Sequence, residues 1–438
     1  MAERIQVGVR CRPPPGNNAL HDASYALELE PNAIHIVPAH SRHVGQRSFA
    51  FDHVWAPGTS QAQVYDQAVA PLVAHLLGGR SGAVLAYGQT GTGKSYTMGF
   101  LEASSAPELG IIPRVFEHLF AALAPTMHKV HMSFCQIYME TVHDLLVPLA
   151  SSLADLPVRE RDSAFYVDGL EVHAVTSLQD ARSLVHVAMA NRALAATGRN
   201  ATSSRSHSLL TISVSTTSWT AQLVLVDLAG SERSLPGLGF AHDATKARLL
   251  EAKSINSSLS ALGNVMSSLA SATRASYRDS KLTKLLKGVL RAGSTVVLAT
   301  VDGAAANLAE TLSTLKFAAR CRHVTLPKRL SIESSSVHKK AAAMQTVATQ
   351  TEALTDVDVL RDAFQKKEIE LHMLYQEQLY KLRRALERLS ARPDDKAVAA
   401  WSVLGDRTST LARHDDDGDD VLSVSTEDGD EAFNQVEL

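Results

Sequence analysis

A glycine-rich segment that follows a short apolar run carries the best-defined chemistry in this chain. The segment Gly88-Gln-Thr-Gly-Thr-Gly-Lys-Ser95 matches the pattern G-x-x-x-x-G-K-[ST] and comes directly after the apolar residues 83–87. Its glycines allow successive backbone N–H groups to turn toward phosphate oxygens. The Lys94 ammonium can reach β- and γ-phosphates, and the Ser95 hydroxyl can ligate Mg²⁺. The residues expected to hold the nucleotide phosphates are Gly88, Gln89, Thr90, Gly91, Thr92, Gly93, Lys94 and Ser95.

Two further polar loops extend this chemistry. The first reads Asn200-Ala-Thr-Ser-Ser-Arg-Ser-His207, and the second, Asp227-Leu-Ala-Gly-Ser-Glu232, follows an apolar run over 223–226. An aspartate at a strand end downstream of a phosphate loop commonly helps to hold Mg²⁺. Gly230 has no side chain, so its N–H could meet a γ-phosphate. We expect both loops to be ordered by the triphosphate and released on hydrolysis.

The elements that position these loops alternate between two kinds. Short apolar runs predict buried strands at 5–9, 84–87, 130–137, 210–215, 223–228 and 295–301. Helical stretches lie between them, for example at 61–77 and 178–196. The alternation predicts an α/β fold with a central, mostly parallel sheet and helices on both faces.

Composition constrains the partners and the compartment. The chain has 438 residues, 45% of them hydrophobic, and a net charge of −3. Residues 401–438 hold eleven acidic residues and two arginines, whereas the other 400 residues carry 41 basic and 35 acidic groups. Three scattered cysteines indicate neither a disulfide framework nor a zinc site, which is typical of a reducing compartment. No apolar run approaches the ~20 residues of a membrane span, and no signal segment is present, so we expect a soluble intracellular protein that does not insert into a membrane. We expect no nucleic-acid partner.

The pattern changes after residue 327. Residues 1–327 form the predicted globular domain, 328–351 a linker, 352–392 a helix, and 393–438 a disordered acidic tail. Six residues of the helix follow coiled-coil spacing: Leu371, Tyr375, Leu379, Leu382, Leu386 and Leu389. This short seam is compatible with a homodimer through 357–392, and equally with a solvated helix that docks on the body.

Eight segments, taken in order, resemble the kinesin motor domain over roughly residues 4–326. The most specific are Ser203–His207 and Asp227–Arg233, which follow the phosphate loop. The others cover 10–13, 51–54, 86–98, 255–263, 277–283 and 310–317. The resemblance implies a P-loop NTPase fold and an ATPase that uses ATP and Mg²⁺ and binds microtubules in the cytoplasmic cytoskeleton.

The resemblance also implies roles for individual residues. Arg10 and Pro13 would pack on the adenine, with Tyr96 stacking on it. Ser95 and Ser204 would ligate Mg²⁺, with Asp227 holding the ion through water. Arg205 and Glu232 would form an ion pair that closes the site, Glu232 would relay a proton, and Ser204 would lie along its route. Asn200, Ser203 and Gly230 would contact the nucleotide, and His207 would hold the loop geometry.

A basic face would bind the acidic microtubule. The residues at the corresponding positions are Arg159, Arg161, Lys246, Lys253, Asn256, Arg274, Arg278, Lys281 and Lys284. Binding through such exposed charges should weaken with salt.

The match departs from the family at several places. Segment 234–250 is longer than usual, and Leu326 and Pro327 stand where the neck linker commonly carries an asparagine. Few residues precede Ile5 to form a cover strand, so linker docking should be weak. We expect an ATP-driven, plus-end-directed motor, with a non-processive regulator of attachment as the alternative. A depolymerase is disfavoured because 31–48 lacks a Lys-Val-Asp tip, and a GTPase because no Asn-Lys-x-Asp motif occurs.

Overall fold

The computed structural model describes residues 3–13, 26–36, 47–100, 108–123, 128–147, 154–198, 203–232 and 242–326. Side chains of 194–198, 203, 242–249 and 292 are not among the described ones. The chain divides into two units, Met1–Val359 and Leu360–Leu438, and every described residue belongs to the first. The predicted linker, coiled-coil helix and acidic tail therefore lie outside the described residues.

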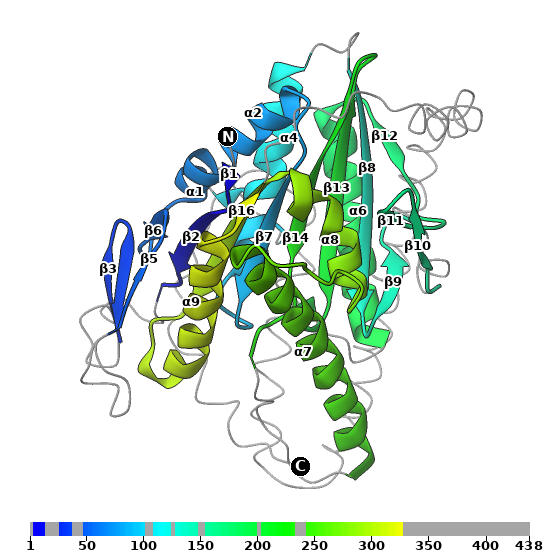
Figure 1. Cartoon of the computed structure of the whole chain (residues 1–438). Coiled ribbons are helices and arrows are strands. Elements are labelled where there is room, and N and C mark those ends of the chain that lie inside the picture. The colour runs from blue at the N-terminus through cyan, green and yellow to red at the C-terminus, as the bar shows by residue number, and fades with distance from the viewer. Residues whose placement is uncertain are drawn as a thin grey trace, which may run out of the picture. The chain divides into compact units, whose positions relative to one another are not determined.

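A nine-stranded sheet runs through the described domain (Figure 1). Eight of its strands follow the order β12-β8-β13-β14-β7-β15-β2-β6, and β9 pairs with β8. In that order the strands are β12 (His173–Val175), β8 (Lys129–Tyr138), β13 (His207–Ser215), β14 (Thr220–Asp227), β7 (Gly82–Gly88), β15 (Ser294–Val301), β2 (Gln6–Cys11) and β6 (His53–Trp55), with β9 at Thr141–Asp144.

The sheet is mixed, and this corrects the prediction of a mostly parallel one. Strands β14, β7, β15, β2 and β6 pair in parallel. Strands β12, β8, β13 and β14 pair antiparallel, as do β8 and β9. A four-residue connection, closed by the hydrogen bond from Thr216 N to Trp219 O, joins β13 to β14. So short a connection joins only antiparallel neighbours.

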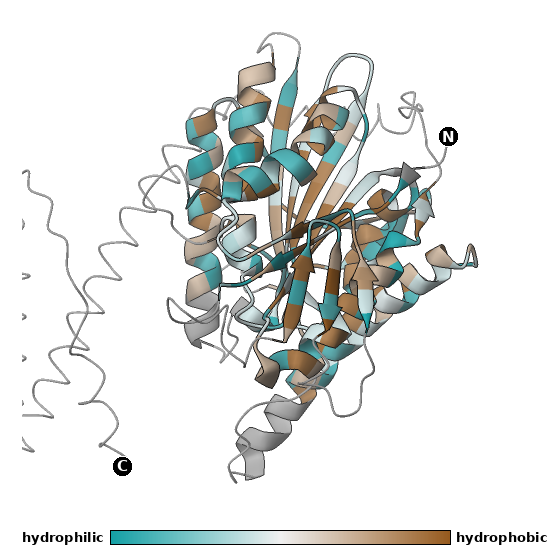
Figure 2. Cartoon of the chain, turned by 90° about the vertical axis from the view of Figure 1, so that its left-hand side faces the viewer, coloured by the Kyte–Doolittle hydropathy of each residue, from teal (hydrophilic) through white to brown (hydrophobic). Residues whose placement is uncertain are grey.

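Helices cover both faces of the sheet. Helices α1 (Gln61–Ala68), α2 (Ala70–Leu77), α4 (Ile111–Ala122) and α6 (Leu178–Gly198) form one group. Helices α7 (His242–Ala270), α8 (Lys281–Ala292) and α9 (Leu308–Arg322) form the other (Figure 1). Every residue of β7 and β15 is buried, and the ribbon coloured by hydropathy shows hydrophobic residues along the central strands (Figure 2). Central strands covered on both faces explain these continuous apolar runs.

The predicted helix over 61–77 is two helices. It divides at Val69, and Pro71 lies in the first turn of α2. A proline there lacks the N–H that would continue the hydrogen bonding of α1. The predicted strands and the helix over 178–196 are present, with ends displaced by up to three residues.

Three small sheets complete the fold. Strands β3 (Leu27–Glu30), β4 (Ala33–Ile36) and β5 (Ser48–Ala50) form one, and β10 (Val158–Arg161) and β11 (Ala164–Val167) form a hairpin. Strand β1 (Glu3–Arg4) pairs antiparallel with β16 (Thr325–Leu326) over two residues. The short helix α3 (Lys94–Met98) and the 3₁₀ turns η4 (Ser203–Arg205) and η5 (Ala305–Asn307) lie among these elements. Within the described part, no helix is both long and apolar enough to cross a membrane.

Candidate nucleotide site

The phosphate loop connects β7 to α3 at the carboxyl end of a central strand. Gly88 lies so close to β15 that a Cβ there would approach Thr300 O to 2.2 Å. Gly91 and Gly93 have φ angles of +81° and +98°, which favour glycine. Among the described residues, apart from its neighbours in the chain and in α3, none has an atom within 4 Å of a Cβ built on Gly93. The loop therefore has the backbone form and the open space that phosphate oxygens need.

Lys94 is buried at the start of α3. Its Nζ donates to Gly88 O at 2.8 Å and to Gln89 O at 2.9 Å, so the loop holds its own ammonium. Burial lowers the pKa of Lys94, and the charges of Asp227 and Glu232 oppose this shift. An ammonium positioned this way can interact with phosphate oxygens.

The donors expected for Mg²⁺ lie together. Ser95 Oγ donates to Asp227 Oδ2 at 2.7 Å, and Asp227 is only 1% exposed. Asp227 Oδ1 has no hydrogen-bond partner among the described residues. An unpartnered buried carboxylate oxygen beside a hydroxyl is a donor set that Mg²⁺ accepts. The residues therefore fit the cation, although no cluster of three or more His, Cys, Asp or Glu occurs in the described part.

Arg192 of α6 is a site residue that the sequence reasoning missed. Its Nη1 lies 3.2 Å from Asp227 Oδ2, and both side chains are buried. Its guanidinium also lies 5.4 Å from the Phe100 ring centroid. The predicted helix 178–196 contains two arginines, Arg182 and Arg192, and spacing along the helix does not identify which of them has a partner on β14.

The two predicted sensor loops contact each other, and the second of them contacts the phosphate loop. Gly230 N donates to Ser204 O at 2.8 Å, and Ser231 N donates to Gly88 O at 3.1 Å. A Cβ on Gly230 would approach Thr90 Oγ1 to 2.3 Å and both Glu232 carboxylate oxygens to 2.4 Å. A side chain here would have to displace the Thr90 and Glu232 side chains. Because Gly230 N bonds Ser204 O, a shift of one loop reaches the other directly.

The expected ion pair between Arg205 and Glu232 is not formed in this structure. Glu232 Oε2 accepts from Thr90 N at 2.8 Å, and its other oxygen accepts from the Thr90 hydroxyl. Arg205 Nη1 instead lies 2.6 Å from Glu251 Oε2 of α7. Tyr138 OH donates to the second Glu251 oxygen at 3.0 Å. Sequence reasoning missed Glu251 because nothing in its local pattern pairs it with Arg205.

The residues expected at the adenine lie beside the phosphate loop. The Arg10 guanidinium carbon is 5.1 Å from the Tyr96 ring centroid, and Tyr96 is 40% exposed. Arg10 Nη1 donates to Gln61 Oε1 at 2.6 Å and to Thr97 Oγ1 at 3.0 Å. Burial lowers the pKa of Arg10, whereas Tyr96 raises it. Pro13 is exposed two residues beyond β2. Asn200 lies outside the described residues, and only the backbone of Ser203 is described.

His207 connects both loops to α7. Its Nδ1 accepts from Ala229 N at 3.0 Å, and this leaves the Nε2 proton to donate to Ser258 Oγ at 2.8 Å. Burial, with smaller contributions from Arg192 and Lys94, lowers the pKa of His207 to about 3. A neutral ring held at both nitrogens suits the expected role in loop geometry.

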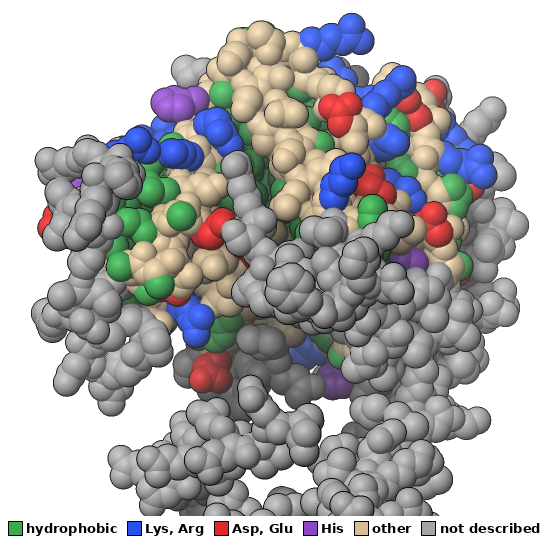
Figure 3. Space-filling model, turned by 90° about the horizontal axis from the view of Figure 1, so that it is seen from below, with side chains coloured by type: hydrophobic (Ala, Val, Ile, Leu, Met, Phe, Trp, Pro, Cys, Tyr) green, Lys and Arg blue, Asp and Glu red, His purple; other side chains and the backbone are tan. Residues whose placement is uncertain are grey.

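The predicted microtubule face is basic but partly neutralised within the chain. Arg278, Lys281 and Arg159 pair with Glu160, Asp155 and Asp168 respectively. Arg161, Lys253, Arg274 and Lys284 form no ion pair with the described residues. The Lys246 side chain is not described, and Asn256 lines a cavity. Figure 3 shows one face of the molecule on which basic and acidic side chains lie next to each other.

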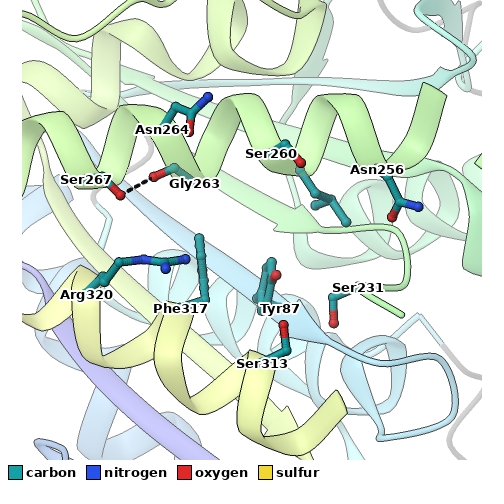
Figure 4. A pocket seen from close by; sticks show the side chains of 11 residues that line it. Tyr87, Ser231, Asn256, Ser260, Gly263, Asn264, Ser267, Ser313, Phe317 and Arg320 are labelled. Carbon is teal, nitrogen blue, oxygen red and sulfur yellow. Dashed lines mark hydrogen bonds between the residues drawn. The ribbon is translucent and has the colours of Figure 1, made fainter. Parts of the chain in front are cut away.

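That cavity, of about 400 Å³, lies between α7 and α9 rather than at the phosphate loop. Figure 4 shows Ser231 at one end of it and Arg320 at the other. Ser267 Oγ donates to Gly263 O at 2.9 Å along its α7 wall. Because Ser231 lines this cavity and its N–H bonds Gly88 O, the second sensor loop forms part of the cavity wall.

A phosphate loop after a central strand, a buried aspartate at the end of the neighbouring strand, and two further polar loops beside them define a nucleotide-hydrolysing fold of the P-loop class. A family model described as the kinesin motor domain matches residues 10–324. The chain belongs to the kinesin motor-domain family.

Individual relatives agree with this assignment. The chain is 40% identical over 339 residues to kinesin-like protein klp-20 of Caenorhabditis elegans, covering 74% of this chain and 51% of that protein. It is 37% identical over 342 residues to chromosome-associated kinesin KIF4B of Homo sapiens, covering 73% of this chain and 26% of that protein. The chain thus spans about half of these curated relatives, or less.

Solved structures show the same fold. The structure of a fast kinesin is 34% identical and gives a TM-score of 0.67, covering 76% of this chain and 95% of that one. A KIF14 dimer with AMP-PNP on a microtubule is 35% identical with a TM-score of 0.67, covering 78% of this chain and 100% of that one.

Proposed function

We propose that this chain hydrolyses ATP and couples hydrolysis to microtubule binding and movement. The contact that carries the proposal is the hydrogen bond from Gly230 N to Ser204 O. It joins the two loops beside the phosphate loop, and the same loops reach α7 through His207 and Arg205. Loss of a terminal phosphate can therefore be transmitted to the helix that borders the predicted track face.

Different residues of the chain would bind the phosphates, hold Mg²⁺ and accept the proton. The loop N–H groups and Lys94 would bind the phosphates, and Ser95, Ser204 and Asp227 would hold Mg²⁺. When bound, the cation would neutralise charge on the transferred phosphoryl group. Glu232 would accept a proton relayed from the attacking water, with Ser204 along the route. Positioning and charge stabilisation dominate such reactions.

Closure of the site would exchange partners. Arg205 would leave Glu251 of α7, and Glu232 would leave Thr90, before the two side chains could pair. Breaking the Arg205–Glu251 contact removes one of two side-chain contacts between the first loop and α7, while His207 still bonds Ser258. We infer that this exchange links triphosphate binding to movement of α7.

A motor, plus-end directed and dimeric through 357–392, is our leading interpretation, acting in the cytoplasm on the microtubule cytoskeleton. The second candidate is a non-processive regulator whose ATPase gates attachment. The neck-linker sequence favours that alternative, because Leu326 and Pro327 stand where an asparagine is common and a proline has no backbone N–H with which to hold a docked linker.

Filament gliding over the surface-bound full chain tests the proposal. Gliding with ATP, together with microtubule-stimulated hydrolysis, supports a motor. Stimulated hydrolysis with static filaments supports the gate. Absence of stimulation would refute both candidates, and light scattering on the same preparation determines whether the chain is a dimer.

A further inference from the structure

The β10–β11 hairpin has two chemically different faces. Its register places Glu160 opposite Phe165 and Arg159 opposite Tyr166. Directly opposed residues point to the same side of a hairpin, so Glu160 and Phe165 share one face. Lys287 Nζ of α8 lies 4.8 Å from the Phe165 ring centroid, which identifies this face as the one turned toward α8.

The other face is basic. Adjacent residues of a strand alternate sides, so Arg159 and Arg161 both lie opposite to Glu160. The Arg161 guanidinium carbon lies 5.2 Å from the Tyr166 ring centroid, which places it on that face. The hairpin thus presents arginines outward while a carboxylate faces the basic helix behind it.

Both oxygens of Glu160 are occupied by cations. Oε2 lies 2.6 Å from Arg278 Nη2, and Oε1 lies 3.3 Å from Lys287 Nζ. The Arg278 side chain is 74% exposed, whereas that of Lys287 is only 15% exposed. Arg278 can therefore rotate toward an external carboxylate, but in doing so it must leave Glu160.

The neighbouring acidic residues are held differently. Asp155 pairs with Lys281, but the same oxygen also accepts from Val142 N at 2.9 Å, so it belongs to the backbone framework. Asp168 pairs with Arg159 across the hairpin end. The contacts of Glu160 in the described part are the two cations, one of them in the predicted track-binding set.

We propose that Glu160 is an internal competitor for the acidic partner of this face. It occupies Arg278 in the unbound chain and so lowers the affinity of the α8 face for the carboxylates of a microtubule. The inference rests on the proposed function, because it requires that the external partner be an acidic filament.

Two charge-matched variants test this role in the full chain. Glu160→Gln removes the competing charge and nearly preserves its shape. Asp162→Asn removes the same charge two residues away in the hairpin turn, where Asp162 forms no ion pair with the described residues. Its φ of +50° is one that asparagine tolerates. Their comparison separates competition for Arg278 from general electrostatic attraction.

Microtubule co-sedimentation with AMP-PNP at low and high salt gives the readout. Because exposed ion pairs contribute at most about 1 kcal/mol, we expect Glu160→Gln to lower Kd about two- to fivefold beyond the effect of Asp162→Asn at low salt. The difference should shrink at high salt, as screening weakens exposed pairs. Equal effects of the two variants, or weaker binding by Glu160→Gln, would overturn the inference.

The Arg278→Gln background provides a second test. There, Glu160→Gln should bind no more tightly than Asp162→Asn, because the contested cation is gone. A gain that persisted without Arg278 would show that Glu160 acts by another route and would overturn the inference. If the unaltered chain bound no microtubules in any nucleotide state, the proposed function would fail as well. If the unaltered chain bound microtubules but Glu160→Gln and Asp162→Asn had equal effects, the role of Glu160 would be refuted while the proposed function would stand.

Discussion

At the scale of single residues, Lys94 is the group whose loss should matter most. Its ammonium is held against the phosphate loop by two carbonyl oxygens, so phosphates entering the loop meet a fixed positive charge. Lys94→Ala should lower ATP turnover at least about 100-fold, the range seen when a preorganised electrostatic contact is removed. Steady-state hydrolysis with and without microtubules measures this. Lys129→Ala, an exposed lysine at the start of β8, is the control; equal turnover in both variants would contradict the assignment.

Glu232 should separate binding from hydrolysis. Its carboxylate accepts hydrogen bonds from Thr90. Because Thr90 is exposed, water can take the place of the carboxylate when the Glu232 side chain is removed. Glu232→Ala should retain nucleotide binding while hydrolysis falls about 10²- to 10⁴-fold, the contribution usual for a proton-transfer group. Fluorescent nucleotide titration and single-turnover hydrolysis distinguish the two steps. Hydrolysis at the unaltered rate would exclude the proposed proton route.

His207 makes a prediction about acid stability. Its folded-state pKa of about 3 lies below the value near 6.5 of an unfolded chain. The stability it contributes is therefore fully present above pH 6.5 and is lost as pH falls toward 3, because only the unfolded state takes up the proton. His207→Asn should remove up to about 1.4 kcal/mol per pH unit from that slope. Urea unfolding at pH 7.5 and 5.5 measures it, and parallel losses in both proteins would contradict it.

At the scale of elements, α8 combines a strong start with a weak interior. Ser280 caps its first turn in a reciprocal capping box with Thr283, and Glu140 accepts from Lys281 N at 2.8 Å. Gly288 lies exposed within the same helix, and a Cβ there would meet no atom within 4 Å. Glycine loses more backbone entropy on folding than alanine, so Gly288 lowers the stability of this helix relative to an alanine at the same position.

Gly288→Ala should therefore stabilise the domain by about 0.5–1 kcal/mol. For a domain of this size that corresponds to a rise in Tm of about 1–3 °C. Gly99→Ala should have the opposite effect, because Gly99 has a φ of +87° and a Cβ there would lie 2.9 Å from Pro113 Cδ. Calorimetry on both variants tests the pair, and a lower Tm for Gly288→Ala would show that α8 is strained at this point.

At the scale of the whole molecule, the candidate nucleotide site and the predicted track face are connected through α7. Glu251 and Ser258 of this helix contact Arg205 and His207, which border the first sensor loop. We expect microtubule affinity to differ between ATP-like, ADP and nucleotide-free states, and to fall with salt in each. Co-sedimentation across the three states measures this. Equal affinity in all three would mean that the contacts through α7 transmit nothing.

Much of the site was predictable because it is local. The phosphate loop is built from consecutive backbone N–H groups, so its glycine spacing carries the geometry, and Lys94, Ser95 and Asp227 lie where the pattern indicated. The buried strands were equally legible, since β7 and β15 are covered on both faces and read as unbroken apolar runs. Whether neighbouring strands run parallel or antiparallel was harder to predict, because it depends on which strands become neighbours in the sheet.

The partners of charged side chains were not predictable. Arg192 meets Asp227, Arg205 meets Glu251, and Glu160 meets Arg278 across separations of 35, 46 and 118 residues. Residue types along the chain determine the backbone conformations that each segment favours and the groups that could bind a phosphate. Which carboxylate lies within reach of which cation depends on how strands and helices far apart in the chain pack together. A charge has no preferred partner until packing brings one near. In this structure packing brings Arg205 to Glu251 of α7 and Arg278 to Glu160 of the hairpin.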